Sequence, residues 1–317
     1  TPAEIKQNIT QIDGKGDVGI FLNYKTRENE EILVRSGVSL VDMAGARNNL
    51  KQELADPFGW DFEKVVDNAR SVWDEYLDRI AIETDDYLQK KKFYTNLYRA
   101  LAAKATWSDA DGRFVDEDER IRQLEKPDDC IVSGEYWNTF WNNQQLFNLM
   151  APEISSQWAR SAIQLYQNSG WFNTDPAGIE HTGVMVAMHP TSQILGAWQS
   201  GIRDFDLNIA YDGLKKMMTT PPQKYEGGGT VGVENLVPYM KYGYIPAGKG
   251  TVSNTMEYAY DDWCLGQMAK ILGKTDDFKL FDKRSNNWCN LFDPESGFMR
   301  PKDEHGNWVE PFDPYHT

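Results

Sequence analysis

The chain has 317 residues, of which 13% are aromatic, and its formal net charge is −15 at pH 7. This length predicts one large domain together with a smaller piece. The negative charge argues against nucleic acid and anionic membrane surfaces as partners, and it is compatible with a neutral substrate or a bound divalent cation. No apolar run approaches the length of a membrane span.

Two short apolar or β-branched runs near the N-terminus, residues 18–22 and 32–34, predict strands separated by a charged turn. Two or three strands cannot bury their faces alone. We therefore expect this segment to be the end of a β-domain whose earlier strands precede it.

The pattern changes to helical spacing from Phe62 onward. An amphipathic helix is predicted from Phe62 to Ile80, and a second begins near Thr84, which is a suitable N-cap. Further helices are predicted over residues 158–167, 192–199, 209–218, 256–272 and 278–291, the first of them ending before Gly170. Long loops rich in Gly, Pro, Asp and Asn separate them, and loops of such length are usually functional. Paired helices with long loops predict a mainly α fold of the α/α-toroid type.

The number and spacing of the cysteines and histidines limit the kinds of metal site that the sequence could form. Cys130, Cys264 and Cys289 are scattered and form no CxxC pair, so neither a disulfide framework nor a zinc site is predicted. The 4 histidines are too few and too dispersed for a His-based metal centre. A metal bound here would be a hard cation held by oxygen ligands. Residues 109–112 faintly resemble a calcium loop, but they lack its remaining ligands and predict a turn.

The most informative stretch is residues 253–263, where three carboxylates and three aromatic rings fall at the start of a predicted helix. Such a set suits a protein that holds a sugar ring and protonates the oxygen leaving it. Glu257 and Asp261 would share one helix face, where a like charge and burial favour a protonated carboxyl. If Ser253 or Asn254 caps the helix, the helix dipole favours the ionised form instead. The alternative is a solvated helix start with ordinary acidic residues.

Two other stretches are candidates for a site. Residues 137–143 pair stacking rings with amides that can hydrogen-bond to hydroxyls, although a buried aromatic helix start with capping Asn residues fits equally well. His181 and His189 lie in one Gly-containing loop. A lone histidine is more often structural than catalytic, but two of the 4 histidines in one loop favour a site.

Residues 243–263 and 292–300 resemble glycoside hydrolase family 92, whose members are calcium-dependent, exo-acting α-mannosidases with an inverting mechanism. The first segment contains the sequence Glu-Tyr-Ala-Tyr-Asp-Asp-Trp, and the second contains Phe-Asp-Pro-Glu-Ser-Gly-Phe-Met-Arg. Supporting matches lie at residues 34–39, 93–95, 108–113 and 201–206. The resemblance thus extends over nearly the whole chain.

The resemblance implies a β-sandwich followed by an (α/α)6 barrel, with the active site between them. Residues 1–52 would be the C-terminal strands of the sandwich, residues 53–90 linker helices, and residues 91–317 an incomplete catalytic barrel. The chain would then be an internal fragment of a longer enzyme, whose remaining segments are expected partners.

The resemblance also implies that Glu257 is the general acid. The substrate-binding residues would be Trp137, Asn138, His189, Tyr258, Asp261 and Asp262, the last two tuning Glu257 or ordering the site. Inverting hydrolysis needs a second carboxylate as base, roughly 6.5–9.5 Å from the acid. This base is expected downstream of the chain. Ca²⁺ is the expected cofactor, its ligands also being expected outside this chain.

The implied substrate is an oligosaccharide or glycan with terminal mannose, in α-1,2 linkage, and the implied location is periplasmic or extracellular. Two positions depart from the usual family pattern, because Asn138 stands in place of Asp and Met188 in place of Asn. These departures leave open a non-hydrolytic carbohydrate-binding relative with a degenerate site, or an α/α-barrel glycosidase for another sugar. The intact Glu257 favours hydrolysis, since a pure lectin has no use for a perturbed acid.

Overall fold

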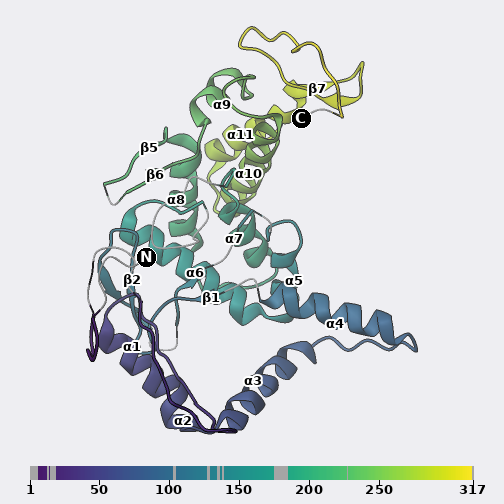
Figure 1. Cartoon of the computed structure of the whole chain (residues 1–317). Coiled ribbons are helices and arrows are strands. Elements are labelled where there is room, and N and C mark those ends of the chain that lie inside the picture. The colour runs from purple at the N-terminus through teal and green to yellow at the C-terminus, as the bar shows by residue number, and fades with distance from the viewer. Residues whose placement is uncertain are drawn as a thin grey trace. The chain divides into compact units, whose positions relative to one another are not determined.

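A computed structural model describes residues 6–12, 14, 19–102, 105–126, 129–133, 136–137, 139–174, 185–226 and 228–315. The chain separates into two compact units, Thr1–Arg35 and Ser36–Thr317. Figure 1 shows that the second unit is built mainly from helices joined by loops and short hairpins. The predicted mainly α fold is thus confirmed, whereas closure into an (α/α)6 barrel stays a prediction. The predicted domain ranges are not tested by this division and also stay predictions.

The described residues of the first unit contain neither helix nor strand. A turn at residues 27–30 is closed by a backbone hydrogen bond of 3.2 Å. The prediction of strands at residues 18–22 and 32–34 is therefore wrong for the part that is described, whereas their place at the end of a β-sandwich stays a prediction. Phe21 and Val34 are 65% and 72% exposed, so no strand among the described residues covers them. Without a partner to pair its backbone groups, an apolar run gains little from the strand conformation.

The second unit begins with the helical segments α1 (Met43–Asn49), the π-helix η1 (Leu50–Ala55), α2 (Asp56–Phe58), α3 (Phe62–Leu77) and α4 (Tyr87–Leu101). The helices predicted from Phe62 and from near Thr84 are confirmed. The N-cap of α4 is Asp86 rather than Thr84, and its Oδ1 accepts the amides of Leu88 and Gln89 at 2.8 and 3.2 Å. Asp is among the preferred caps because its carboxylate satisfies free amides of the first turn.

The remaining helices are α5 (Asn143–Met150), α6 (Pro152–Ser169), α7 (Pro190–Gln199), α8 (Leu207–Thr219), α9 (Leu236–Tyr242), α10 (Val252–Ile271), α11 (Thr275–Arg284) and the 3-10 helix η2 (Asn287–Leu291). The four helices predicted between residues 158 and 272 are confirmed. Helix α6 ends as predicted at Gly170, whose φ of +76° is accessible to glycine without strain. The helix predicted at 278–291 is wrong in length, because α11 ends at Arg284 and η2 is separate.

Short antiparallel strand pairs lie between and after these helices within the described residues. They pair β1 (Ala105–Thr106) with β4 (Val132–Ser133), β2 (Arg113–Val115) with β3 (Ile121–Gln123), β5 (Gln223–Lys224) with β6 (Thr230–Val231), and β7 (Phe292–Asp293) with β8 (Phe298–Met299). The turn predicted at residues 109–112 is confirmed, since the Gly112 amide donates to the Asp109 carbonyl at 2.8 Å.

The largest apolar core lies between α6, α7, α8, α10 and α11 and includes Trp158, Ile194, Tyr211, Leu265 and Phe281. Helix α10 packs against α7, α8 and α11. It is therefore buried on several sides, and two of its carboxylates, Asp261 and Asp262, are 0% exposed. Charged side chains that are buried in this way require ion-pair or hydrogen-bond partners nearby.

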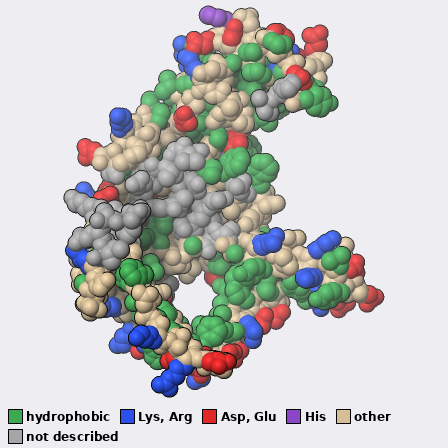
Figure 2. Space-filling model, in the orientation of Figure 1, with side chains coloured by type: hydrophobic (Ala, Val, Ile, Leu, Met, Phe, Trp, Pro, Cys, Tyr) green, Lys and Arg blue, Asp and Glu red, His purple; other side chains and the backbone are tan. Residues whose placement is uncertain are grey.

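Apolar side chains also remain at the surface. Along α4, Tyr87 and Leu88 are 77% and 55% exposed, and Figure 2 shows hydrophobic side chains there among charged ones. In the part of the chain that the structure describes, no helix combines the length and apolar character needed to cross a membrane.

Candidate active site

Glu257 lies in the second turn of α10, because the helix begins earlier than the sequence predicts. Thr251 is the N-cap. Its side chain accepts the Asn254 amide, and Asn254 Oδ1 accepts the Thr251 amide at 3.0 Å. This reciprocal capping box satisfies two backbone donors. The predicted caps Ser253 and Asn254 lie inside the helix, so Glu257 lies beyond the first turn, where the helix dipole acts most strongly.

The carboxylate of Glu257 is held by two ring nitrogens from distant parts of the chain. Its Oε2 accepts the indole Nε1–H of Trp137 at 3.0 Å and lies 2.8 Å from Nε2 of His189. The Glu257 side chain is 16% exposed. These contacts bring together the acid, the aromatic stretch and the histidine that the sequence predicts as site residues.

His189 lies between two carboxylates of α10. Its Nε2 faces Glu257, and its Nδ1 lies 3.5 Å from Oδ1 of Asp261. The other oxygen of Asp261 accepts the Met188 amide at 2.7 Å. Phe140 stacks on the imidazole with ring centroids 3.7 Å apart and an interplanar angle of 13°. The prediction that Glu257 and Asp261 share one helix face is confirmed by their common contact.

The charge of His189 follows from this arrangement. Burial lowers the pKa of His189, but the carboxylates of Asp261 and Glu257 outweigh it and raise the pKa to about 9. At neutral pH the ring is therefore an imidazolium, and both nitrogens are donors. The site thus contains a buried cation between two acidic side chains.

Sequence reasoning does not single out two residues that shape this site. Phe140 belongs to the aromatic stretch at residues 137–143. Its spacing from Trp137 is the sequence signal that could have identified it as a site residue. No sequence signal marks Gln193 as a site residue. Its Nε2 donates to the Tyr136 carbonyl at 3.1 Å and to Thr139 Oγ1 at 2.9 Å, which fixes the loop carrying Trp137 against α7.

Tyr258 and Asp262 were predicted as substrate contacts, and the structure does not bring them together with Glu257. Asp262 Oδ2 accepts the Tyr239 hydroxyl at 2.7 Å and Arg284 Nε at 2.9 Å. Burial raises the pKa of Asp262 to about 7, against the opposing effect of Arg284. Tyr258 is 1% exposed and packs edge-on against Tyr239. Successive positions of a helix face different sides. Tyr258 and Asp262 therefore face neighbouring segments and hold α10 in place against them.

The candidate residues Asn138 and His181 lie outside the described residues. The ranges that are described also contain no group of three or more His, Cys, Asp or Glu side chains able to hold a metal ion. None of the described residues is therefore assigned to Ca²⁺.

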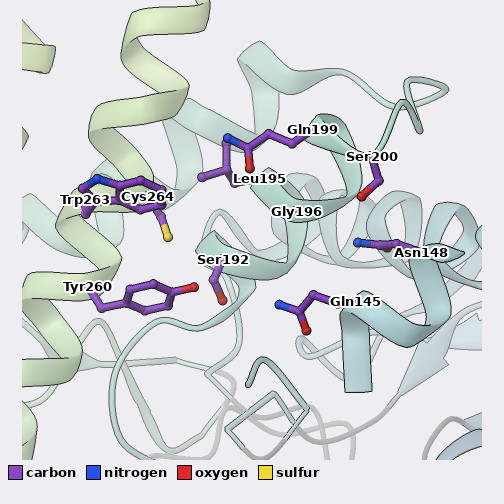
Figure 3. A pocket seen from close by; sticks show the side chains of 10 residues that line it. All are labelled: Gln145, Asn148, Ser192, Leu195, Gly196, Gln199, Ser200, Tyr260, Trp263 and Cys264. Atoms are coloured by element: carbon purple, nitrogen blue, oxygen red, sulfur yellow. The ribbon is translucent and has the colours of Figure 1, made fainter. Parts of the chain in front are cut away.

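A pocket of about 250 Å³ lies beside this cluster. Figure 3 shows Tyr260, Trp263 and Cys264 of α10 on one side, residues of α7 including Ser192 and Gln199 in the middle, and Gln145 and Asn148 of α5 on the other. The Tyr260 ring lies 5.7 Å from that of Phe140, which links the pocket to the Glu257 cluster. The residues that line the pocket carry no formal charge, which suits a neutral, hydroxyl-rich ligand.

The sequence matches the glycosyl hydrolase family 92 catalytic domain over residues 45–317. The chain belongs to this family.

Individual relatives agree with this assignment. The chain is 30% identical to the family GH92 inverting mannosidase BT2199 of Bacteroides thetaiotaomicron, with a TM-score of 0.77 over 87% of this chain and 37% of that one. The α-mannosidase BT3965 of the same organism is 29% identical, with a TM-score of 0.76 over 88% of this chain and 36% of that one. An uncharacterized secreted glycosidase of Arthroderma benhamiae is 25% identical over 92% of this chain and 36% of its own length. The chain thus spans about a third of the length of these relatives.

Proposed function

We propose that the protein is a glycoside hydrolase, an inverting exo-α-mannosidase with Glu257 as its general acid. The observation that carries the proposal is the half-buried carboxyl of Glu257, held by the Trp137 indole and the His189 imidazole. Membership of the family and the names of two solved relatives, an inverting mannosidase and an α-mannosidase, support it.

In this reaction Glu257 gives its proton to the glycosidic oxygen as the bond to the anomeric carbon breaks. Water attacks from the opposite face, and a second carboxylate accepts its proton. That base is not assigned to a residue of this chain. Trp137 and Asn138 are proposed to contact the terminal sugar, whereas His189, buried between Glu257 and Asp261, is proposed to order the acid. Mannose in α-1,2 linkage is the proposed substrate. Phe140 keeps the His189 ring in place by stacking on it.

Calcium dependence and a location outside the cytosol belong to the same proposal. No step is assigned to the ion, because the described residues offer no cluster to hold it. Removal of metal with EDTA should abolish mannose release, and added Ca²⁺ should restore it. The naming of one relative as a secreted glycosidase supports the location.

The experiment compares the complete protein with its Glu257→Gln variant on an α-1,2-linked mannobiose. Because a general acid contributes about 10²–10⁴ in rate, mannose release should fall by that factor. Glu83→Gln, which changes an exposed glutamate in the same way, should leave the rate unchanged. Proton NMR at early times should show the β-anomer of mannose first, as inversion requires.

Other outcomes identify the alternatives. Release that is unaffected by Glu257→Gln would remove Glu257 from the acid role. Binding of the disaccharide without release by either protein would identify a non-hydrolytic carbohydrate-binding protein. Hydrolysis of other aryl glycosides but not of the mannoside would identify a glycosidase for another sugar.

A further inference from the structure

The two oxygens of Glu257 are not equivalent. Oε2 faces Trp137 Nε1 at 3.0 Å and His189 Nε2 at 2.8 Å. An indole nitrogen can only donate, and an imidazolium nitrogen can only donate. Oε2 therefore accepts two hydrogen bonds, which leaves no room for a proton between it and either ring. A proton on this carboxyl must be on Oε1, which takes part in neither of these two hydrogen bonds.

Asp261 determines whether His189 Nε2 donates. Its Oδ1 and the His189 Nδ1 lie 3.5 Å apart, and neither atom makes a hydrogen bond within the described residues, so the two face each other as an ion pair. Both side chains are buried, 0% and 1% exposed. Glu257 and Asp261 are the charged groups that act on His189 from α10, and the stacked ring of Phe140 is neutral. Asp261 lies at Nδ1, on the opposite side of the ring from Glu257 at Nε2, and can balance the imidazolium charge while Glu257 holds the proton that it donates.

We propose that Asp261 is a positioning residue that acts through His189 to place the transferable proton of Glu257 on Oε1, facing the glycosidic oxygen. This inference rests on the proposed role of Glu257 as general acid. In the reaction the Oε1–H bond breaks as the proton joins the leaving oxygen. The carboxylate that forms is stabilised at Oε2 by the two donors that are already in place.

Loss of the Asp261 charge reverses the direction of the hydrogen bond between His189 Nε2 and Glu257 Oε2. When Glu257 holds its proton, Asp261 is the remaining carboxylate that faces the imidazolium among the described residues, so without the Asp261 charge the buried ring releases its Nε2 proton to solvent and becomes neutral. The remaining proton is on Nδ1, on the side of residue 261, and Nε2 becomes an acceptor. The Glu257 proton is captured in an Oε2–H···Nε2 bond and points away from the substrate.

Asp261→Asn removes the charge while keeping the shape. The amide oxygen of Asn can still accept the Met188 amide, which Asp261 accepts at 2.7 Å. The start of α7 therefore remains anchored in the variant. Asp282→Asn, which changes an exposed carboxylate of α11, is the matched control.

The first test measures kcat/KM of the complete protein on two α-mannosides. One is an α-1,2-linked mannobiose, whose leaving oxygen needs protonation, and the other is a 2,4-dinitrophenyl mannoside, whose leaving group does not. In Asp261→Asn the disaccharide should lose about 10- to 1000-fold and the dinitrophenyl substrate less than threefold, because only acid catalysis is affected. The alkaline limb of the pH profile of kcat/KM for the disaccharide should shift as well. Equal losses on both substrates, or no loss, would overturn the proposal.

The second test does not depend on hydrolysis. Nitrogen-15 NMR of histidine-labelled complete protein reports the protonation of both His189 nitrogens, with His189→Gln used to assign the signals. We expect two protonated nitrogens at pH 7 in the wild-type protein and in Glu257→Gln, and a neutral ring in Asp261→Asn. A neutral His189 at pH 7 in the wild-type protein would contradict the inference even if the variants fail to fold.

The two tests separate the two claims. If the protein releases no mannose but His189 behaves as expected, the proposed function fails and the hydrogen-bond arrangement stands. If mannose is released while His189 is neutral, the positioning role of Asp261 fails and the glycosidase remains.

Discussion

Ala187 adopts a left-handed backbone conformation immediately before Met188 and His189. Its φ is +69° and its side chain is 3% exposed. A Cβ in this region costs roughly 1–2 kcal/mol, which glycine avoids. Strained residues of this kind concentrate at functional sites, where the surrounding structure holds them.

Ala187→Gly should therefore stabilise the protein. Relief of the strain exceeds the extra freedom that glycine has in the unfolded chain, so the free energy of unfolding should rise by about 0.5–1 kcal/mol. Urea unfolding of the wild-type and variant proteins measures the difference. A less stable variant would show that Ala187 is unstrained in this conformation.

Glu117 is a buried carboxyl outside the candidate active site. It is 1% exposed, and neither of its oxygens has a hydrogen-bond partner within the described residues. Burial raises the pKa of Glu117 from its ordinary value of 4.5 to about 7, and the charges of Asp116 and Asp118 act in the same direction. The protonated form is thus the one that the fold accommodates.

This shift predicts a pH-dependent stability. The pKa is higher in the folded state than in the unfolded state, so the contribution of Glu117 is fully present below pH 4.5 and is lost as pH rises through about 7. The difference of about 2.5 pH units corresponds to roughly 3 kcal/mol as an upper bound. Glu117→Gln should consequently stabilise the protein more at pH 8 than at pH 5, as measured by urea unfolding. The exposed Glu125→Gln is the control, and a gain that is the same at both pH values would contradict the account.

At the scale of elements, two helix glycines make a matched comparison. A Cβ on Gly213 of α8 would lie 2.6 Å from Phe172 and 2.7 Å from Tyr166, whose rings stack 4.9 Å apart. A Cβ on Gly266 of α10 would meet nothing closer than 3.6 Å. The first helix needs glycine for packing, and the second does not.

Gly213→Ala should destabilise the protein by about 1–3 kcal/mol through overpacking. Gly266→Ala should instead stabilise it by up to about 1 kcal/mol, because alanine is the better helix former. Thermal unfolding of both variants gives the comparison. Stabilisation by Gly213→Ala would show that the Tyr166 and Phe172 rings can move aside without loss.

Helical periodicity predicts the main helices because their apolar faces repeat at 3.6 residues, and it correctly places Glu257 and Asp261 on one face. It does not choose among neighbouring capping residues. Thr251, rather than Ser253 or Asn254, caps α10 because its side chain and that of Asn254 satisfy each other. The family resemblance implies Tyr258 and Asp262 as site residues, but both contact Tyr239, because neighbouring helix positions point in different directions.

Long-range pairing is the part that sequence reasoning cannot supply. The contact of His189 with Glu257 joins residues 68 positions apart, and that of Trp137 joins residues 120 positions apart. The strands predicted near the N-terminus fail for a related reason. An apolar run shows that residues could enter a sheet, but it does not show that a partner strand is present.

At the scale of the whole molecule, the chain is a member of family 92 that spans about a third of the length of its relatives. Its activity therefore has to be measured on the complete protein. The net charge of −15 that this chain carries repels anionic partners.

The most direct test of the general-acid role of Glu257 is a comparison of leaving groups in Glu257→Gln. We predict that kcat/KM for an α-1,2-linked mannobiose falls by about 10²–10⁴, while kcat/KM for 2,4-dinitrophenyl α-mannoside falls by less than about tenfold, because that leaving group departs without a proton. An equal fall on both substrates would contradict the claim and give Glu257 a structural or substrate-binding role instead.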